Sequence, residues 1–200
     1  MKTIALEGTL RSELGKKSTK ALRKEESVPC VVYGGENNIH FSAPAKAFRD
    51  LIYTNELRKA SITVDGKSVE AIVKDVQFHP VTDKIVHIDF LQLVEGQTVL
   101  TEIPVRLVGN AAGVKTGGVL VQKVRKLKLK TTPNNLTASI EVDVAKLELG
   151  KSIRVREVNV ADGIQIVTNG GTPLASVDIP RALRSAQSAT AEPAADTVAK

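Results

Sequence analysis

The feature that most constrains the fold is a succession of short apolar segments, each ended by a turn signal. Between residues 99 and 179, GNAAG, TTPNN, ADG and TNGG divide segments of this kind. Their β-branched composition and regular interruption are typical of strands, and they predict a small β-sandwich or barrel. The six expected strands are 99–108, 119–130, 136–142, 153–160, 164–167 and 174–179.

The first half of the chain is also expected to be rich in strands, at residues 3–10, 28–33 and 39–41. The dipeptide Asp65-Gly66 lies between two apolar segments and predicts a β-hairpin, because both residues tolerate the backbone of a tight turn. In the segment that follows, Ile88 and Phe90 alternate with His87 and Asp89. This alternation predicts a strand with one buried face and one polar face.

Two helices are expected in the same half. Ser18 or Thr19 could cap a short basic helix. A longer helix is predicted over residues 42–57, because Pro44 suits a first turn and apolar side chains recur at helical spacing. Those side chains, Phe48, Leu51 and Ile52, are expected to pack in the core.

The overall prediction is a mainly β protein with a few helices, divided into a domain at 1–94, an all-β domain at 95–180 and a disordered tail at 181–200. The net charge of +6 is compatible with an acidic partner. No apolar run is long enough to span a bilayer, so we expect a cytoplasmic protein without a membrane partner. The single cysteine, Cys30, is expected to be buried rather than reactive.

Residues 11–24 contain six cations and one acid, and a strand ending in Tyr33 and two glycines follows them. Lysine and arginine side chains can bind phosphates, and a tyrosine can stack on a base. The segment therefore predicts either a nucleic-acid contact or a solvated basic loop. The cations are Arg11, Lys16, Lys17, Lys20, Arg23 and Lys24.

The polar face that carries His87 and Asp89 is a second candidate for RNA contact. Asp89 could accept from a base amino group while His87 donates to a phosphate, a 2′-hydroxyl or a base edge. Gln77 and His79 have the same two-residue spacing upstream. The alternative is that all four are ordinary outward positions of a half-buried sheet.

The sequence offers little that suggests catalysis, and we expect no enzyme, cofactor, metal or small-molecule substrate. GVKTGGVL at 113–120 lacks the spacing of a phosphate-binding loop. A zinc site would require His40, His79 and His87 to converge with a further ligand such as Asp89. A metal-dependent hydrolase using His79, His87 and Asp89 is therefore the weakest of the alternatives.

Lysines also alternate with leucines at residues 126–130, so Lys126, Lys128 and Lys130 share one face of an expected strand. This face could contact RNA or protein. It could equally be a solvated edge strand, kept charged against aggregation.

Three motifs together resemble the bacterial family of large-subunit ribosomal protein twenty-five, which binds 5S ribosomal RNA. They are RxxxGK followed by a Ser/Thr and xLR, then PxVVYGG, then DVQxHPxxxKxxHIDF. GNAAGVKTGGVLVQ, IEVDVAKLELGKSIRV and VDIP are similar to the extra β domain of the long form, the general stress protein CTC. The resemblance covers about residues 1–180.

The resemblance implies a β-barrel-like domain that binds the loop E region of 5S rRNA at the central protuberance of the large ribosomal subunit. It implies no catalytic activity. Through the C-terminal domain, other large-subunit proteins and 23S rRNA become candidate partners. The candidate RNA-binding residues are Arg11, Lys16, Lys17, Lys20, Arg23, Tyr33, Gln77, His79, His87 and Asp89.

Two positions depart from the family pattern, Lys17 and Ala21. Lys17 stands where the family often has glycine, and Lys20 and Ala21 stand where it often has two arginines. A lysine in place of arginine loses the planar bidentate fork, and an alanine loses the charge. Lys17 can restore the charge but not the geometry. We therefore expect RNA binding that depends more on point charges than on the bidentate contacts of arginine. The alternative function is a stress-linked β-rich protein-interaction module with only non-specific affinity for RNA.

Overall fold

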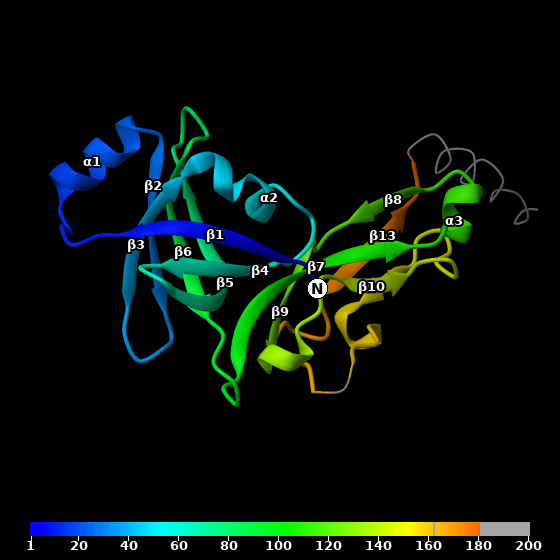
Figure 1. Ribbon diagram of the computed structural model, residues 1–200. Helices are drawn as coiled ribbons and strands as arrows, with labels where there is room; N and C mark the ends of the chain where they lie inside the picture. Colours follow the sequence, from blue (N-terminus) through cyan, green and yellow to red (C-terminus); the bar gives the residue numbers. More distant parts are fainter. Residues whose placement is uncertain (162, 181–200) are drawn as a thin grey trace, which may run out of the picture. The chain divides into compact units, whose positions relative to one another are not determined.

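A computed structural model describes residues 1–161 and 163–180 of the chain (Figure 1). The predicted disordered tail at 181–200 and the middle residue of the predicted turn at 161–163 lie outside this range. The chain forms two compact units. The first comprises Met1–Pro104, Lys126–Ile140 and Val160–Val167, and the second comprises Val105–Arg125, Glu141–Asn159 and the described residues from Thr168 onward. The proposed boundary near residue 94 stays a prediction.

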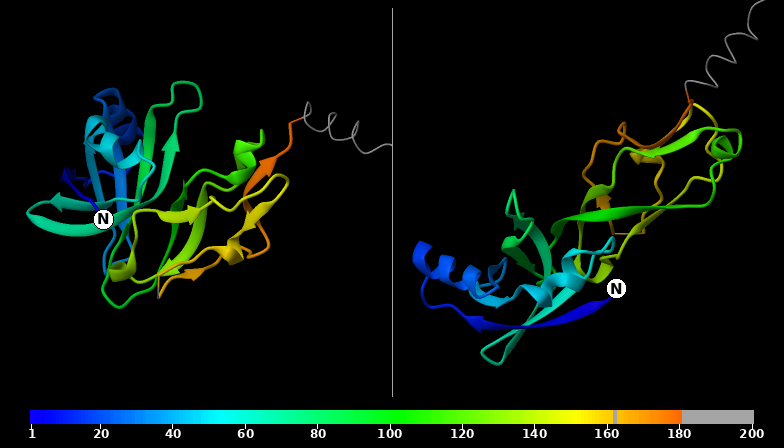
Figure 2. Two further views of the ribbon diagram at one scale, coloured as in Figure 1. Left: turned by 90° about the vertical axis from the view of Figure 1, so that its right-hand side faces the viewer. Right: turned by 90° about the horizontal axis from the view of Figure 1, so that it is seen from above.

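Six strands of the first unit close into a barrel in the order β1-β3-β2-β6-β5-β4. Parallel pairing of β1 with β4 completes the closure, and β6 lies between β2, which is parallel to it, and β5, which is antiparallel (Figure 2). The expected barrel-like N-terminal domain is therefore present. The strands are β1 (Thr3–Leu10), β2 (Ser27–Tyr33), β3 (Ile39–Pro44), β4 (Lys59–Val64), β5 (Lys67–Phe78) and β6 (Ile85–Gln92).

The barrel core explains the alternation predicted for β6. Ile88 and Phe90 are fully buried, whereas His87 and Asp89 are half-buried on the other side of the strand. The ring of Phe90 packs between those of Phe41 and Phe48, at centroid distances of 5.8 and 6.2 Å. Aromatic and β-branched side chains thus fill the interior and leave the polar residues of β6 outside.

The predicted hairpin joins β4 to β5. Its turn residues, Asp65 and Gly66, have φ values of 48° and 77°, in the left-handed region that suits a two-residue hairpin turn. The pairing of Val64 with Lys67 directly across the turn fixes the register of both strands.

The short basic helix is α1 (Lys16–Lys24), but its start differs from the prediction. Gly15 is the N-cap and has an extended backbone, and no side chain caps the helix. The Thr19 hydroxyl instead donates back to the carbonyls of Gly15 and Lys16, because it already lies within the first turns. The expected Ser18 or Thr19 cap is therefore wrong.

The predicted helix over 42–57 is also wrong in extent. Strand β3 continues to Pro44, because Ser42 and Ala43 pair with β2. Only a 3-10 helix, η1 (Ala45–Phe48), and one turn of helix, α2 (Arg49–Ile52), follow. Phe48 and Leu51 are buried as expected.

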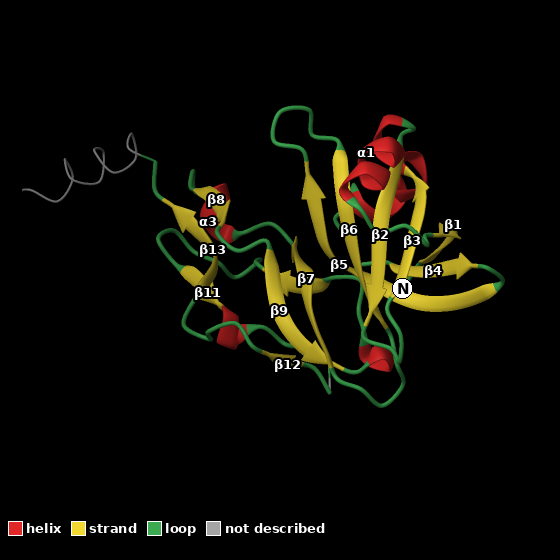
Figure 3. Cartoon of the chain, turned by 90° about the vertical axis from the view of Figure 1, so that its left-hand side faces the viewer, coloured by secondary structure: helices red, strands yellow, loops and turns green. Residues whose placement is uncertain are grey.

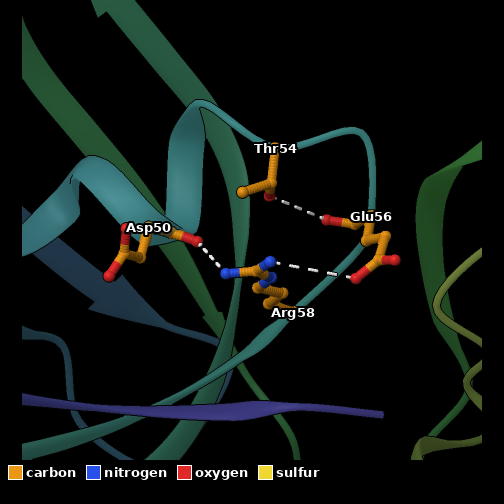
Figure 4. A network of polar contacts seen from close by, with 4 residues as sticks. All are labelled: Asp50, Thr54, Glu56 and Arg58. Atoms are coloured by element: carbon orange, nitrogen blue, oxygen red, sulfur yellow. Dashed lines mark hydrogen bonds and ion pairs between the residues drawn. The ribbon is translucent and has the colours of Figure 1, made fainter.

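A small polar network orders the segment between α2 and β4 (Figure 4). Arg58 donates from Nη1 to the backbone carbonyl of Asp50 at 2.6 Å and pairs through Nη2 with Glu56 at 3.8 Å. The Thr54 hydroxyl donates to the carbonyl of Glu56. These contacts hold the loop that the sequence pattern had assigned to the end of a helix.

The rest of the chain is rich in strands, as predicted, but several are shorter than expected, and they form two sheets. One sheet has the order β10-β7-β9-β12 and the other β11-β13-β8. The expected strand at 119–130 divides in two, and the one expected at 153–160 ends at Arg154, where a 3-10 helix follows. The strands are β7 (Val99–Val108), β8 (Val119–Gln122), β9 (Lys126–Thr131), β10 (Ile140–Asp143), β11 (Ser152–Arg154), β12 (Gln165–Ile166) and β13 (Pro173–Asp178).

Three more short helical segments lie among these strands: α3 (Ala112–Lys115), η2 (Pro133–Asn135) and η3 (Val155–Glu157). Among the residues that the structure describes, no helix is long and apolar enough to cross a membrane.

Candidate RNA-binding surface

Polar side chains gather on the outer face of three neighbouring barrel strands, β2, β6 and β5. Cross-strand pairing puts Val31 of β2 opposite Asp89 of β6, and Asp89 opposite Asp75 of β5. One step along, Gln77 pairs with His87. Since alternate residues share a face, Tyr33 lies on the same side as Val31. We call Tyr33, Asp75, Gln77, His87 and Asp89 the polar face.

His87 and Asp89 are two residues apart on β6 and contact each other directly. Nδ1 of His87 lies 2.8 Å from Oδ1 of Asp89, but the two atoms are not aligned as a hydrogen bond, and the contact is an ion pair only when the imidazole is protonated. Their side chains are 27% and 30% exposed. Both therefore remain accessible to a ligand on this side of the barrel.

Asp75 is a member of the polar face that the sequence reasoning missed. It lies directly opposite Asp89, and like charges in this position destabilise a sheet. Burial, together with the carboxylates of Asp89 and Asp75, raises the pKa of Tyr33. The Tyr33 hydroxyl therefore remains a neutral donor beside two acceptors. The spacing of Asp75 and Gln77 could have revealed this residue.

His79 does not continue the polar face. It follows the end of β5, after an irregularity in the pairing between Gln77 and Phe78. Its Nδ1 accepts from the backbone N–H groups of Val81 and Thr82, both at 3.3 Å. His79 thus shapes the β5–β6 loop, and in the neutral ring Nε2 carries the proton and can donate outward.

Helix α1 lies beside β2 at one end of the barrel (Figure 3). Near the end of the helix, Nε of Arg23 donates to the carbonyl of Val86 on β6 at 3.2 Å. Val86 directly precedes His87, so this hydrogen bond holds the basic helix next to the polar face. Sequence reasoning assigned Arg23 only to a ligand, whereas one of its donors is used within the protein.

The lysines of α1 are exposed and begin in its first turn. Lys16 and Lys17 occupy that turn, which contains no acidic residue, and Lys20 follows one turn later. Cations near a helix N-terminus oppose the helix dipole, and the first N–H groups of a helix attract anions. A phosphate bound at this end of α1 would offset the repulsion between the lysines and the helix dipole, and it would accept hydrogen bonds from the first N–H groups.

The amino-acid sequence matches known proteins along most of its length. Residues 6–90 match the Ribosomal L25p family, and residues 98–181 match the family described as Ribosomal protein TL5, C-terminal domain. A relative from Phocaeicola vulgatus, named Large ribosomal subunit protein bL25, is 43% identical over 193 residues, 93% of this chain and 97% of the relative. The chain belongs to the bL25 family of large ribosomal subunit proteins.

Two further bL25 relatives have similar coverage. The protein from Porphyromonas gingivalis is 44% identical over 93% of this chain and 97% of its own length. The protein from Cytophaga hutchinsonii is 40% identical over 96% of this chain and its entire length. The resemblance to the long form, with a second β domain, is therefore confirmed.

The L25p match covers all ten candidate residues and both departures from the family pattern. Lys17 and Ala21 are both exposed on α1. An arginine at position 21 would therefore point away from the barrel, and the alanine leaves a gap in the charge of this bL25 helix. This gap is compatible with the expected shift toward point charges.

Arg11 lies in the connection between β1 and α1 and is half-buried. Its backbone N–H donates to the carbonyl of His40, and Nη2 donates to the carbonyl of Glu13 at 3.2 Å. Nε is buried without a hydrogen-bond partner in the described part of the chain. The remaining guanidinium donors can bind an anion only at the surface of this connection.

Two chemical expectations concern residues inside or near the barrel. Cys30 is buried, and burial raises the pKa of its thiol despite the nearby charge of Arg11, so it is an unreactive core residue. Within residues 1–161 and 163–180, no three His, Cys, Asp or Glu side chains lie where they could hold a metal ion. His79, His87 and Asp89 are all described, and they do not converge as a set of three metal ligands.

Proposed function

We propose that this bL25 chain is a structural, non-catalytic constituent of the large ribosomal subunit and binds the loop E region of 5S rRNA at the central protuberance. The observation that carries the proposal is the hydrogen bond from Arg23 to Val86, which holds a basic helix beside a polar strand face. Positive charge and base-reading groups thus lie on one surface. A ribosomal role also places the protein in the cytoplasm.

The two parts of this surface have different tasks. The exposed lysines of α1, with the outward donors of Arg11 and Arg23, bind phosphates, which positions the RNA and provides most of the affinity. The polar face reads base edges and riboses. Single-stranded loops and irregular helices present those groups, whereas regular double-stranded RNA hides them.

The paired carboxylates suit this reading task. Asp75 and Asp89 are acceptors when ionised, and amino groups of cytosine, adenine and guanine are donors. Tyr33 and His87 add donors for phosphate oxygens or 2′-hydroxyls. A sheet that places two carboxylates opposite each other loses some stability, and a bound base amino group would offset that loss.

The candidate RNA-binding residues remain part of this proposal. On the polar face we assign Tyr33, Gln77, His87 and Asp89 to base or ribose contacts, and we add Asp75 to them. His79 is assigned to a contact from the β5–β6 loop through Nε2. The residues assigned to phosphate are Arg11, Lys16, Lys17, Lys20 and Arg23.

A protein-interaction module with only non-specific RNA affinity is the alternative. Under this alternative, the hydrogen-bond acceptors of the polar face would have no RNA groups to bind. The matches along nearly the whole chain also favour a ribosomal role. Stable presence of the protein in salt-washed large subunits supports the ribosomal role. Loss during washing would favour the alternative.

Binding of the full chain to purified 5S rRNA tests the proposal. We expect affinity that falls steeply with salt, because phosphate contacts release counterions, and clear preference over an unrelated RNA hairpin of equal length. Equal affinity for both RNAs, or binding that salt does not weaken, would refute specific recognition of 5S rRNA.

A further inference from the structure

The sequence allows three roles for the lysine face of β9: contact with RNA, contact with protein, or protection of an edge strand by charge. In the structure β9 pairs with β7 along its whole length, and its second half is also covered on the other side, where β12 pairs with Leu129 and Lys130. The backbone N–H of Val167 also donates to the carbonyl of Lys128. Edge protection therefore does not explain the lysines at Lys128 and Lys130.

The three lysines form a regular ladder on the exposed side of the sheet. Leu127 and Leu129 between them are fully buried, which fixes the opposite direction of the lysine side chains. Alternate residues on a strand lie about 6.6 Å apart. Successive lysines at this spacing can each reach a different phosphate of one nucleic-acid strand.

The neighbours of the ladder determine which partner it fits. On β7, Leu100, Glu102 and Pro104 lie opposite the three lysines. Lys128 pairs with Glu102 at 3.9 Å, and because both side chains are exposed this ion pair contributes little. On the β7 side, the three lysines thus have one carboxylate opposite them, that of Glu102.

A protein partner would favour a different composition. The centres of protein interfaces are enriched in aromatic residues, methionine and arginine and depleted in lysine. Strands β7, β9 and β12 contain no aromatic residue or methionine. Lysine instead binds phosphate as a point charge and does not require a precise planar geometry.

We infer that Lys126, Lys128 and Lys130 form a second RNA-binding surface, which binds the phosphate backbone of ribosomal RNA without reading its sequence. The inference rests on the proposed ribosomal role and assigns the ladder an RNA segment separate from the 5S contact of the barrel. It accounts for lysines that continue along β9 into the half of the strand that β12 covers, where no exposed edge needs a charge.

Binding to large subunits prepared without this protein tests the inference. The variant carries Lys126→Gln and Lys130→Gln in the full chain, which removes two exposed charges and keeps both buried leucines. The charge-matched control carries Lys146→Gln and Lys151→Gln, also at exposed positions. The measured quantities are affinity at 0.1 M salt and the slope of log affinity against log salt.

We expect the ladder variant to bind subunits about three- to tenfold more weakly and to lose about 1.5 from the salt slope, since each phosphate contact contributes about 0.7 to 0.9. The control should match the wild type. An unchanged slope in the ladder variant, or an equal loss in the control, would overturn the inference.

A crosslinking measurement identifies the partner directly. With Lys130→benzoylphenylalanine in assembled subunits, crosslinks to ribosomal RNA are expected, and crosslinks to protein alone would overturn the inference. The ladder variant should bind isolated 5S rRNA like the wild type, since its barrel is unchanged. Failure of the wild type to bind 5S rRNA would refute the proposed function, while the ladder is judged on subunit binding.

Discussion

Helix α1 and strand β9 are both densely basic, but their surroundings differ. Arg23 ties α1 to β6, next to acceptors and donors of the polar face. The lysines of β9 have Leu100, Glu102 and Pro104 as their neighbours on β7. The difference teaches that positive charge indicates contact with phosphate, whereas the groups beside the charge determine whether bases can be read.

The largest effect is expected from removing a core side chain of the barrel, because the polar face beside α1 depends on the folded barrel. Phe90 is fully buried between Phe41 and Phe48, so Phe90→Ala is expected to lower the free energy of unfolding by about 3 to 5 kcal/mol. All six aromatic residues lie between positions 33 and 90. Near-ultraviolet circular dichroism during urea unfolding therefore reports the barrel alone.

The matched control for this change is Phe78→Ala, because Phe78 is 44% exposed. It is expected to cost less than about 1 kcal/mol. If Phe90→Ala destabilised the barrel no more than Phe78→Ala, then the ring cluster would not be what holds the polar face in place.

Removing one hydrogen-bond acceptor of the polar face should distinguish the contribution of base recognition to RNA affinity from the contribution of charge. Asp89→Ala is expected to weaken binding to 5S rRNA by about 1 to 3 kcal/mol, because a desolvated polar contact is lost. The salt slope should hardly change, since no phosphate contact is removed. Filter binding at several salt concentrations measures both quantities.

The control is Glu7→Ala, which removes an exposed carboxylate from β1. It should leave the affinity unchanged or raise it slightly. An affinity for 5S rRNA that Asp89→Ala does not alter would remove Asp89 from the binding surface.

Alkaline pH should affect the barrel through its single thiol. Because burial raises the pKa of Cys30, the unfolded chain releases this proton above about pH 8.5 while the folded chain keeps it. Stability is therefore complete below that pH and falls as the pH rises. Between pH 8 and pH 10 we expect a loss of about 2 kcal/mol from this group.

Urea unfolding followed in the near ultraviolet at both pH values measures this loss. Cys30→Ala should be less stable than the wild type at pH 8, because its smaller side chain leaves a cavity, but should lack this part of the pH dependence. Identical pH dependence in the two proteins would mean that the thiol does not titrate as its burial requires.

Local patterns were sufficient for much of the barrel. The strands near the N-terminus, the Asp65-Gly66 hairpin and the two faces of β6 follow from alternation and turn residues. The helix expected over 42–57 failed because pairing of Ser42 and Ala43 with β2 overrides local preference. Tertiary pairing of this kind is not visible in a short window of sequence.

The candidate surface shows the same limit. The polar face could be predicted because its members alternate on strands, and Asp75 followed the same rule. The link between Arg23 and Val86 could not, since 63 residues separate them. Nor could the role of His79, which depends on the loop folding back onto its own ring.

Amide hydrogen exchange of the full chain, with and without purified 5S rRNA, tests the central claim most directly. The account predicts slower exchange in α1, at the end of β2 and along β5 and β6, with unchanged exchange in β9. Slower exchange in β9 together with unchanged exchange in β6 would contradict it, because 5S rRNA would then bind by charge alone and away from the polar face.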